Sequence, residues 1–90
     1  MLDRVREKIL SLTAGEDVKI YLFGSFAKGN YRTSSDIDIA IGGASSKKIR
    51  EIREYFEESN IPRKIDIVDM NFAGEKILRE IERTGVRWRD

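Results

Sequence analysis

The chain has 90 residues, the size of one small domain, and its 40% apolar content with a single proline is typical of a globular protein. The absence of cysteine and histidine excludes disulfides, thiolate and imidazole metal ligands, and Ser-His-Asp or Cys-His catalysis. Seventeen Lys and Arg against sixteen Asp and Glu leave a net charge of +1, so no global field attracts nucleic acid or membranes. Any metal ion must then bind through oxygen, which favours Mg²⁺, Mn²⁺ or Ca²⁺.

No apolar run approaches the ~18 residues that span a membrane, and the first residues contain no uninterrupted apolar signal region. No linker or internal repeat divides the chain. We therefore expect one domain over residues 1–90, a cytoplasmic location, no membrane contact and no direct binding of nucleic acid.

The first half of the chain predicts a helix followed by two strands. The apolar residues at helical spacing are Leu2, Val5, Ile9 and Leu12. Residues 18–23 alternate and are rich in β-forming residues, which predicts a strand that ends at Gly24-Ser25. Residues 26–35 are small, polar and basic, which indicates a loop with room for one helical turn. Residues 36–41 alternate again and predict the second strand.

The second half predicts two helices around a third strand. Ser45 or Ser46 is expected to cap the first of these helices. Its buried stripe is expected to be Ile49, Ile52 and Phe56. Residues 64–68 predict the third strand, and Gly85 is expected to end the last helix before a short edge strand at 86–88. The apolar residues that mark the last helix are Ile77, Leu78 and Ile81. The order α-β-β-α-β-α predicts a small α/β domain, a mixed sheet flanked by helices.

Three aspartates are expected to meet at one end of this sheet. Asp36 and Asp38 lie two residues apart in a strand, so they project from the same face, ~7 Å apart, and repel each other. The helix between the second and third strands suggests a parallel crossover, which puts the beginnings of both strands side by side. Asp66, near the start of the third strand, can therefore join them. Mg²⁺ typically binds such carboxylates together with substrate phosphates.

Gly24-Ser25 is expected to lie beside these carboxylates. The short connection between the first two strands allows them to be antiparallel neighbours, so the end of one lies beside the start of the other. Glycine lets the backbone approach a ligand closely, and serine offers a hydroxyl and an N–H to a phosphate. The pattern suits a metal–triphosphate held between the turn and the aspartates.

These residues resemble the signature of a known superfamily. Gly24-Ser25, ten intervening residues and the Asp-x-Asp pair form the G-S-x10-D-x-D pattern of DNA polymerase beta-like nucleotidyltransferases. Over about residues 18–69 the chain is similar to the minimal, stand-alone MNT proteins of that superfamily. The resemblance implies that Asp36, Asp38 and Asp66 are catalytic residues and ligands of two Mg²⁺ ions, with Mn²⁺ as an alternative. It also implies that Gly24 and Ser25 bind the nucleotide phosphates.

Two basic residues in the following loop are further nucleotide-binding candidates. Lys28 stands where the family often has arginine, and Arg32 falls in the same loop over the expected triphosphate. Neutralisation of phosphate charge and a solvated surface role are equally open for both. Asp69 competes with Asp66 for the third carboxylate, but it has the opposite strand parity and lies ~10 Å further on. We expect Asp69 or Asn71 to cap the last helix instead.

The family resemblance also implies an activity and a partner. MNT proteins are antitoxins of HEPN/MNT toxin–antitoxin pairs, and members of this kind use ATP to transfer AMP to a tyrosine of the HEPN toxin. Two alternatives remain open, a non-catalytic antitoxin that covers its toxin and a nucleotide-sensing subunit of a larger enzyme.

Two groups of side chains are expected to be structural. The charged residues at 47–58 predict an exposed helix face with weak pairs. The aromatic residues expected in the core or at an edge are Tyr31, Phe72 and Trp88.

Overall fold

The computed structural model describes residues 2–29 and 36–89. Its elements are α1 (Leu2–Leu12), β1 (Lys19–Phe23), α2 (Ser25–Lys28), β2 (Ile37–Gly42), α3 (Ser46–Glu57), β3 (Ile65–Asp69), α4 (Glu75–Thr84) and β4 (Val86–Arg89). The predicted α/β class is confirmed, and so are the helical turn after the first strand and the edge strand at the end. None of the helices in these ranges is long and apolar enough to cross a membrane.

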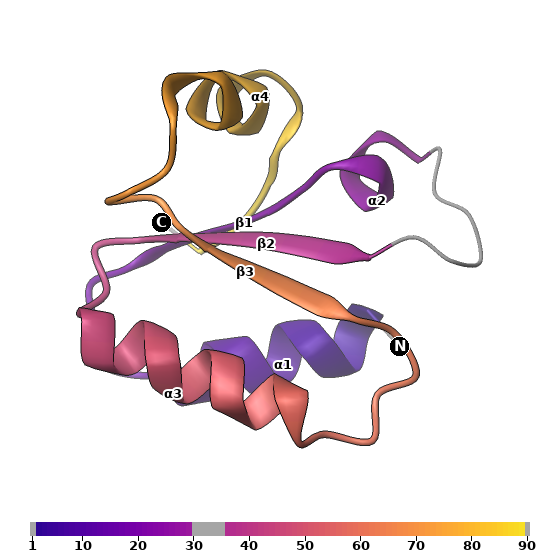
Figure 1. Cartoon of the computed structure of the whole chain (residues 1–90), viewed down its shortest axis with the longest axis vertical. Coiled ribbons are helices and arrows are strands. Elements are labelled where there is room, and N and C mark those ends of the chain that lie inside the picture. The colour runs from indigo at the N-terminus through magenta and orange to yellow at the C-terminus, as the bar shows by residue number, and fades with distance from the viewer. Residues whose placement is uncertain (1, 30–35, 90) are drawn as a thin grey trace.

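The four strands form one mixed sheet in the order β3-β2-β1-β4. β2 and β3 are parallel, as the crossover through α3 predicted, whereas β1 is antiparallel to both β2 and β4. α1 and α3 cover one face of the sheet, and α4 lies on the other (Figure 1). The short α2 stands at the end of the sheet where β2 and β3 begin.

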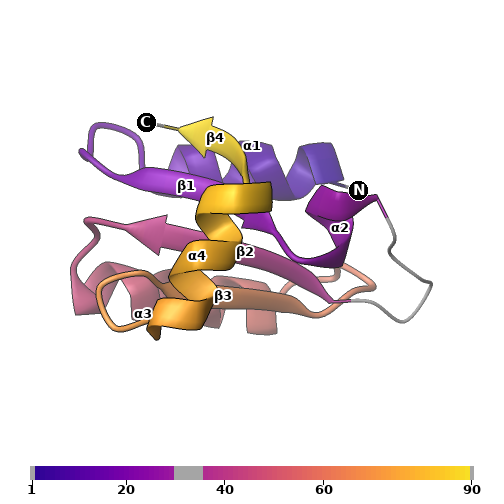
Figure 2. The same ribbon diagram turned by 90° about the horizontal axis from the view of Figure 1, so that it is seen from above.

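The two faces of the sheet are buried to different depths. On the α1/α3 face, Ile37, Ile39 and Ile41 of β2 are completely buried in the main core. The opposite face carries a much smaller cluster, in which Ile81 of α4 packs on Phe23 and Ala40. α4 crosses the strands rather than running along them (Figure 2). One helix therefore covers only the middle of that face, and the beginnings of β2 and β3 stay accessible.

Several local predictions can be compared with the structure. Ser45 caps α3 as expected and accepts a hydrogen bond from the Lys48 N–H at 3.1 Å. The capping role predicted for Asp69 or Asn71 is wrong, because Gly74 is the N-cap of α4. The Asp69 carboxylate instead accepts the Asn71 N–H at 3.0 Å and closes the turn after β3. Phe72, expected to pack, is 80% exposed.

The last helix ends at Gly85, as predicted. Gly85 follows Thr84 and donates its N–H to the Ile81 carbonyl at 2.8 Å, which ends the helix. Its backbone is extended, with φ −67° and ψ 143°, so it has no left-handed conformation that would require glycine. Glycine is required there for space, because a Cβ would collide with the Ile81 carbonyl oxygen.

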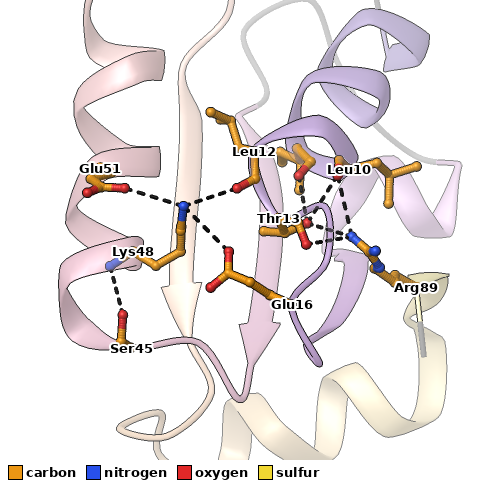
Figure 3. Close-up of polar contacts among 9 residues, drawn as sticks. Leu10, Leu12, Thr13, Glu16, Ser45, Lys48, Glu51 and Arg89 are labelled. Atoms are coloured by element: carbon orange, nitrogen blue, oxygen red, sulfur yellow. Dashed lines mark hydrogen bonds and ion pairs between the residues drawn. The ribbon is translucent and has the colours of Figure 1, made fainter.

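The charged residues of α3 were predicted to form an exposed face with weak ion pairs, but one of them also makes contacts to another part of the chain. The Lys48 ammonium lies 3.2 Å from the Leu12 carbonyl oxygen and 3.4 Å from carboxylate oxygens of Glu16 and Glu51, so it joins α3 to the end of α1 (Figure 3). Beside it, Arg89 of β4 donates to the Thr13 carbonyl and hydroxyl oxygens, both at 2.9 Å. These contacts tie the last strand to α1.

Candidate active site

The three predicted aspartates lie near the beginnings of β2 and β3, where two of them are register partners. Asp38 of β2 is the direct register partner of Asp66 in β3, and Phe23 at the end of β1 is its partner on the other side. Asp36 precedes β2 with the same parity as Asp38, so the three side chains belong to the sheet face that carries α4. Asp36 and Asp66 are exposed, whereas Asp38 is half-buried. The predicted convergence of two strand beginnings is confirmed by this register.

Gly24 is pressed against Asp38, and its conformation explains why glycine is needed. It ends β1 with φ +74° and ψ −154°, a conformation that L side chains rarely adopt. A Cβ at this position would collide with the Asp38 Oδ2 atom. Gly24 is also the N-cap of α2, and its carbonyl accepts the Lys28 N–H at 3.1 Å. The turn therefore brings its backbone and Ser25 next to the central carboxylate.

The pKa of Asp38 shows that the neighbouring carboxylates act on it electrostatically. Burial, together with repulsion from Asp66, Asp36 and Glu80, raises the pKa of Asp38 to about 6. Within the described ranges, none of the three predicted aspartates forms an ion pair with a basic side chain. A bound cation would relieve this repulsion, and all the donors are oxygen atoms, so the residues fit Mg²⁺ in charge and in ligand type. In the part of the chain with described coordinates, no three acidic side chains are already close enough to enclose a metal ion.

Lys28 and Glu80 add a feature that sequence reasoning missed. Lys28, predicted to bind nucleotide, pairs with Glu80 of α4 at 2.9 Å. Glu80 lies about forty residues from the Asp-x-Asp pair and belongs to no part of the motif, so only the packing of α4 brings it to the site. The sequence shows that the last helix is rich in glutamate, but it does not show which glutamate lies near the carboxylates. The other basic candidate, Arg32, lies outside the described residues.

The surroundings of Asp66 include a cavity of about 490 Å³ between the end of α3 and the start of β3. Arg63 and Lys64 line it beside Asp66. The Arg63 guanidinium also lies over the ring of Phe26 in α2, 5.0 Å from the ring centre, and so links the loop before β3 to the helix after Gly24. Asp66 is therefore accessible from the side of this cavity.

A family comparison agrees with this geometry. Residues 7–87 match the family model described as polymerase beta, nucleotidyltransferase. Among proteins with curated functions, none matches the chain significantly.

Solved structures with the same fold come from toxin–antitoxin complexes. A toxin–antitoxin structure with AMP-PNP has a TM-score of 0.77 and 25% identity, covering 99% of this chain and 73% of that one. A tyrosine-to-alanine variant of an MntA toxin–antitoxin complex has a TM-score of 0.68 and 28% identity over 90% of this chain and 68% of that one. A Shewanella oneidensis complex of a tri-AMPylated HEPN toxin with an MNT antitoxin, at 24% identity, supports the fold with a TM-score of 0.69 over 99% of this chain and 72% of that one.

The family model spans the Gly-Ser turn, the Asp-x-Asp pair and Asp66, and the solved structures share the surrounding fold. The resemblance to MNT proteins predicted from the sequence is thereby confirmed. The chain belongs to the polymerase beta nucleotidyltransferase family.

Proposed function

We propose that this protein is a Mg²⁺-dependent adenylyltransferase that transfers AMP from ATP to a hydroxyl group of a partner protein, most specifically a tyrosine of a HEPN toxin. The observation that carries the proposal is the direct register of Asp38 with Asp66, with Gly24 packed against Asp38. A carboxylate pair beside a glycine–serine turn, without histidine or cysteine, supports metal-assisted transfer of a phosphate-linked group. Nucleotidyltransferases of this family generally use divalent metal ions, which suits that chemistry.

Each residue has a role that follows from its position. Asp36 and Asp38 would hold Mg²⁺, and Asp66 would complete the ligand set on the acceptor side. Bound Mg²⁺ would neutralise the charge that develops on the phosphates. Gly24 and Ser25 would orient the β- and γ-phosphates through the backbone N–H groups and the serine hydroxyl.

The transfer itself is an in-line displacement. The acceptor oxygen forms a bond to the α-phosphorus, and the bond from this phosphorus to the oxygen that bridges to the β-phosphorus breaks. Pyrophosphate leaves, and the hydroxyl proton passes to Asp66. Positioning and charge neutralisation supply most of the acceleration, because no covalent intermediate on the protein is needed.

The partner is suggested by the toxin–antitoxin structures. They include a complex with the ATP analogue AMP-PNP and a HEPN toxin that carries AMP groups. The site lies at an open end of the sheet, so the acceptor must be recognised by surface contact with a second protein. A HEPN toxin with a reactive tyrosine meets this requirement.

Intact mass spectrometry tests the proposal directly. The purified protein is incubated in catalytic amounts with Mg·ATP and the HEPN protein encoded beside it, if such a gene is present. We expect the acceptor to gain one or more AMP masses on tyrosine, and RNase inhibition to persist after the transferase is removed. An acceptor that is inhibited only by stoichiometric protein, without ATP and without a mass change, would identify a covering antitoxin instead. ATP binding without inhibition or transfer would favour a nucleotide-sensing subunit.

A further inference from the structure

A second charged feature lies beside the carboxylates, in a cleft of about 420 Å³ between α2 and α4. We call it the α2–α4 cleft. Its lining consists of four basic side chains, one acidic side chain and one threonine, namely Lys28, Lys76, Arg79, Arg83, Glu80 and Thr84. The proposed transfer assigns a role to none of them, and only Lys28 was a nucleotide-binding candidate from the sequence. A concentration of cations is notable in a chain whose net charge is only +1.

Two of these cations are already neutralised and two are not. Lys28 pairs with Glu80 at 2.9 Å, and Arg79 pairs with Glu75 at 2.6 Å. Lys76 and Arg83 are exposed, and neither has an ion pair with a side chain in the described ranges. The cleft therefore presents uncompensated positive charge.

The cleft opens close to the proposed reaction centre. Ile81, next to Glu80, packs on Phe23 and Ala40. Phe23 is the register partner of Asp38, and Ala40 is two residues further along the same face of β2. Lys28, which lines the cleft, donates its N–H to the carbonyl of Gly24, the residue packed against Asp38, so the cleft borders the turn that reaches the central carboxylate. The carboxylates repel other anions, so the positive charge on α4 favours the approach of an anionic partner from that side.

The pattern of charges in the α2–α4 cleft favours a protein rather than a nucleic acid as the bound partner. Lys76 and Arg83 are seven residues apart, about 10 Å along the helix, which suits one or two carboxylates. Binding of nucleic acid typically neutralises many phosphates along a continuous basic surface. The basic surface of α4 is interrupted by Glu75, Glu80 and Glu82, which would repel the phosphates of a nucleic-acid backbone.

We infer that the α2–α4 cleft docks an acidic segment of the acceptor protein, with Lys76 and Arg83 as the residues that recognise its carboxylates. This inference rests on the proposed function, since it supplies the acceptor recognition that transfer requires. Docking there holds the acceptor on the face of the sheet that carries Asp38 and α4.

The test separates docking from catalysis by measuring binding of a probe peptide. Fluorescence anisotropy follows a labelled hexaglutamate peptide at low ionic strength, for the unaltered chain and for Lys76→Glu/Arg83→Glu. A matched control, Lys47→Glu/Arg50→Glu, makes the same change in net charge on α3. We expect the α4 variant to bind about tenfold or more weakly and the α3 variant to bind like the unaltered chain. Lys76→Ala/Arg83→Ala repeats the measurement without new negative charge, in case charge reversal unfolds α4.

The inference is overturned if the unaltered chain does not bind the peptide, or if both charge reversals weaken binding equally. It is also overturned if a labelled hexauridylate binds as tightly as the peptide, since that indicates an unselective polyanion surface. Failure of AMP transfer by a chain that still binds the peptide would count against the proposed function alone. Where transfer occurs, the α4 variant should raise the KM for the acceptor and leave the KM for ATP unchanged.

Discussion

Replacing Asp38 with asparagine should stabilise the fold at neutral pH while it removes the proposed activity. The pKa of Asp38 is raised from 3.8 to about 6, first by burial and then by repulsion from Asp66, Asp36 and Glu80. A raised carboxyl pKa means that the folded state binds more protons than the unfolded state between about pH 4 and 6. The unfolding free energy of the unaltered chain should therefore fall as the pH rises through this window and level off above it.

The size of the effect follows from the shift. A change from 3.8 to about 6 corresponds to about 3 kcal/mol at full strength. Asp38 is only half-buried, so solvent screening reduces this to about 1 kcal/mol. Asparagine has the shape of the protonated acid without its titration, so Asp38→Asn should be more stable by about that amount at pH 7, or about 4–8 °C in Tm.

The assay is thermal unfolding without divalent metal at pH 7 and at pH 4. The gain from Asp38→Asn should be present at pH 7 and absent at pH 4, where the native carboxyl is already protonated. Asp17→Asn, at an exposed turn before β1, serves as the control for loss of one negative charge. Equal or lower stability of Asp38→Asn at pH 7, or a gain that persists unchanged at pH 4, would refute the electrostatic reasoning.

Three further outcomes are expected. Asp66→Asn should lower the rate of AMP transfer by ~100-fold or more. Asp69→Asn should keep most of the rate, because Asp69 is at the far end of β3, where its carboxylate accepts the Asn71 N–H. Equal losses in a transfer assay would contradict this assignment. Gly24→Ala should cost more unfolding free energy than Gly29→Ala, since both have positive φ but only Gly24 would also collide with Asp38, and urea unfolding measures the difference. Mg·ATP at about 100 times its Kd should stabilise the native chain by about 2.7 kcal/mol, and a Tm that does not respond to Mg·ATP would indicate a site that binds no nucleotide.

The sequence by itself determined the order of elements and the main membership of the site. The alternation of apolar and acidic residues in 36–41 and 64–68 assigned the isoleucines to one face of the sheet and the aspartates to the other. This assignment is possible from sequence because successive side chains of a strand always point to opposite faces. The helix between these strands suggested a parallel crossover, which brings Asp66 to the Asp-x-Asp pair, and the register of Asp38 with Asp66 agrees with it. For Gly24 the sequence predicted a close approach of the backbone to a ligand, whereas its close approach to Asp38 came only from the structure.

Only the tertiary structure decided how α4 lies, and with it the electrostatic environment of the site. The packing of Ile81 on Phe23 and Ala40 turns Glu80 toward Lys28 and Asp38, and leaves Lys76 and Arg83 at an open cleft. The helix periodicity identified an apolar stripe but not the angle at which it crosses the strands (Figure 2). Ion pairs such as Lys28–Glu80 join residues far apart in the chain, so they depend on that angle and on the register of the sheet rather than on any local pattern.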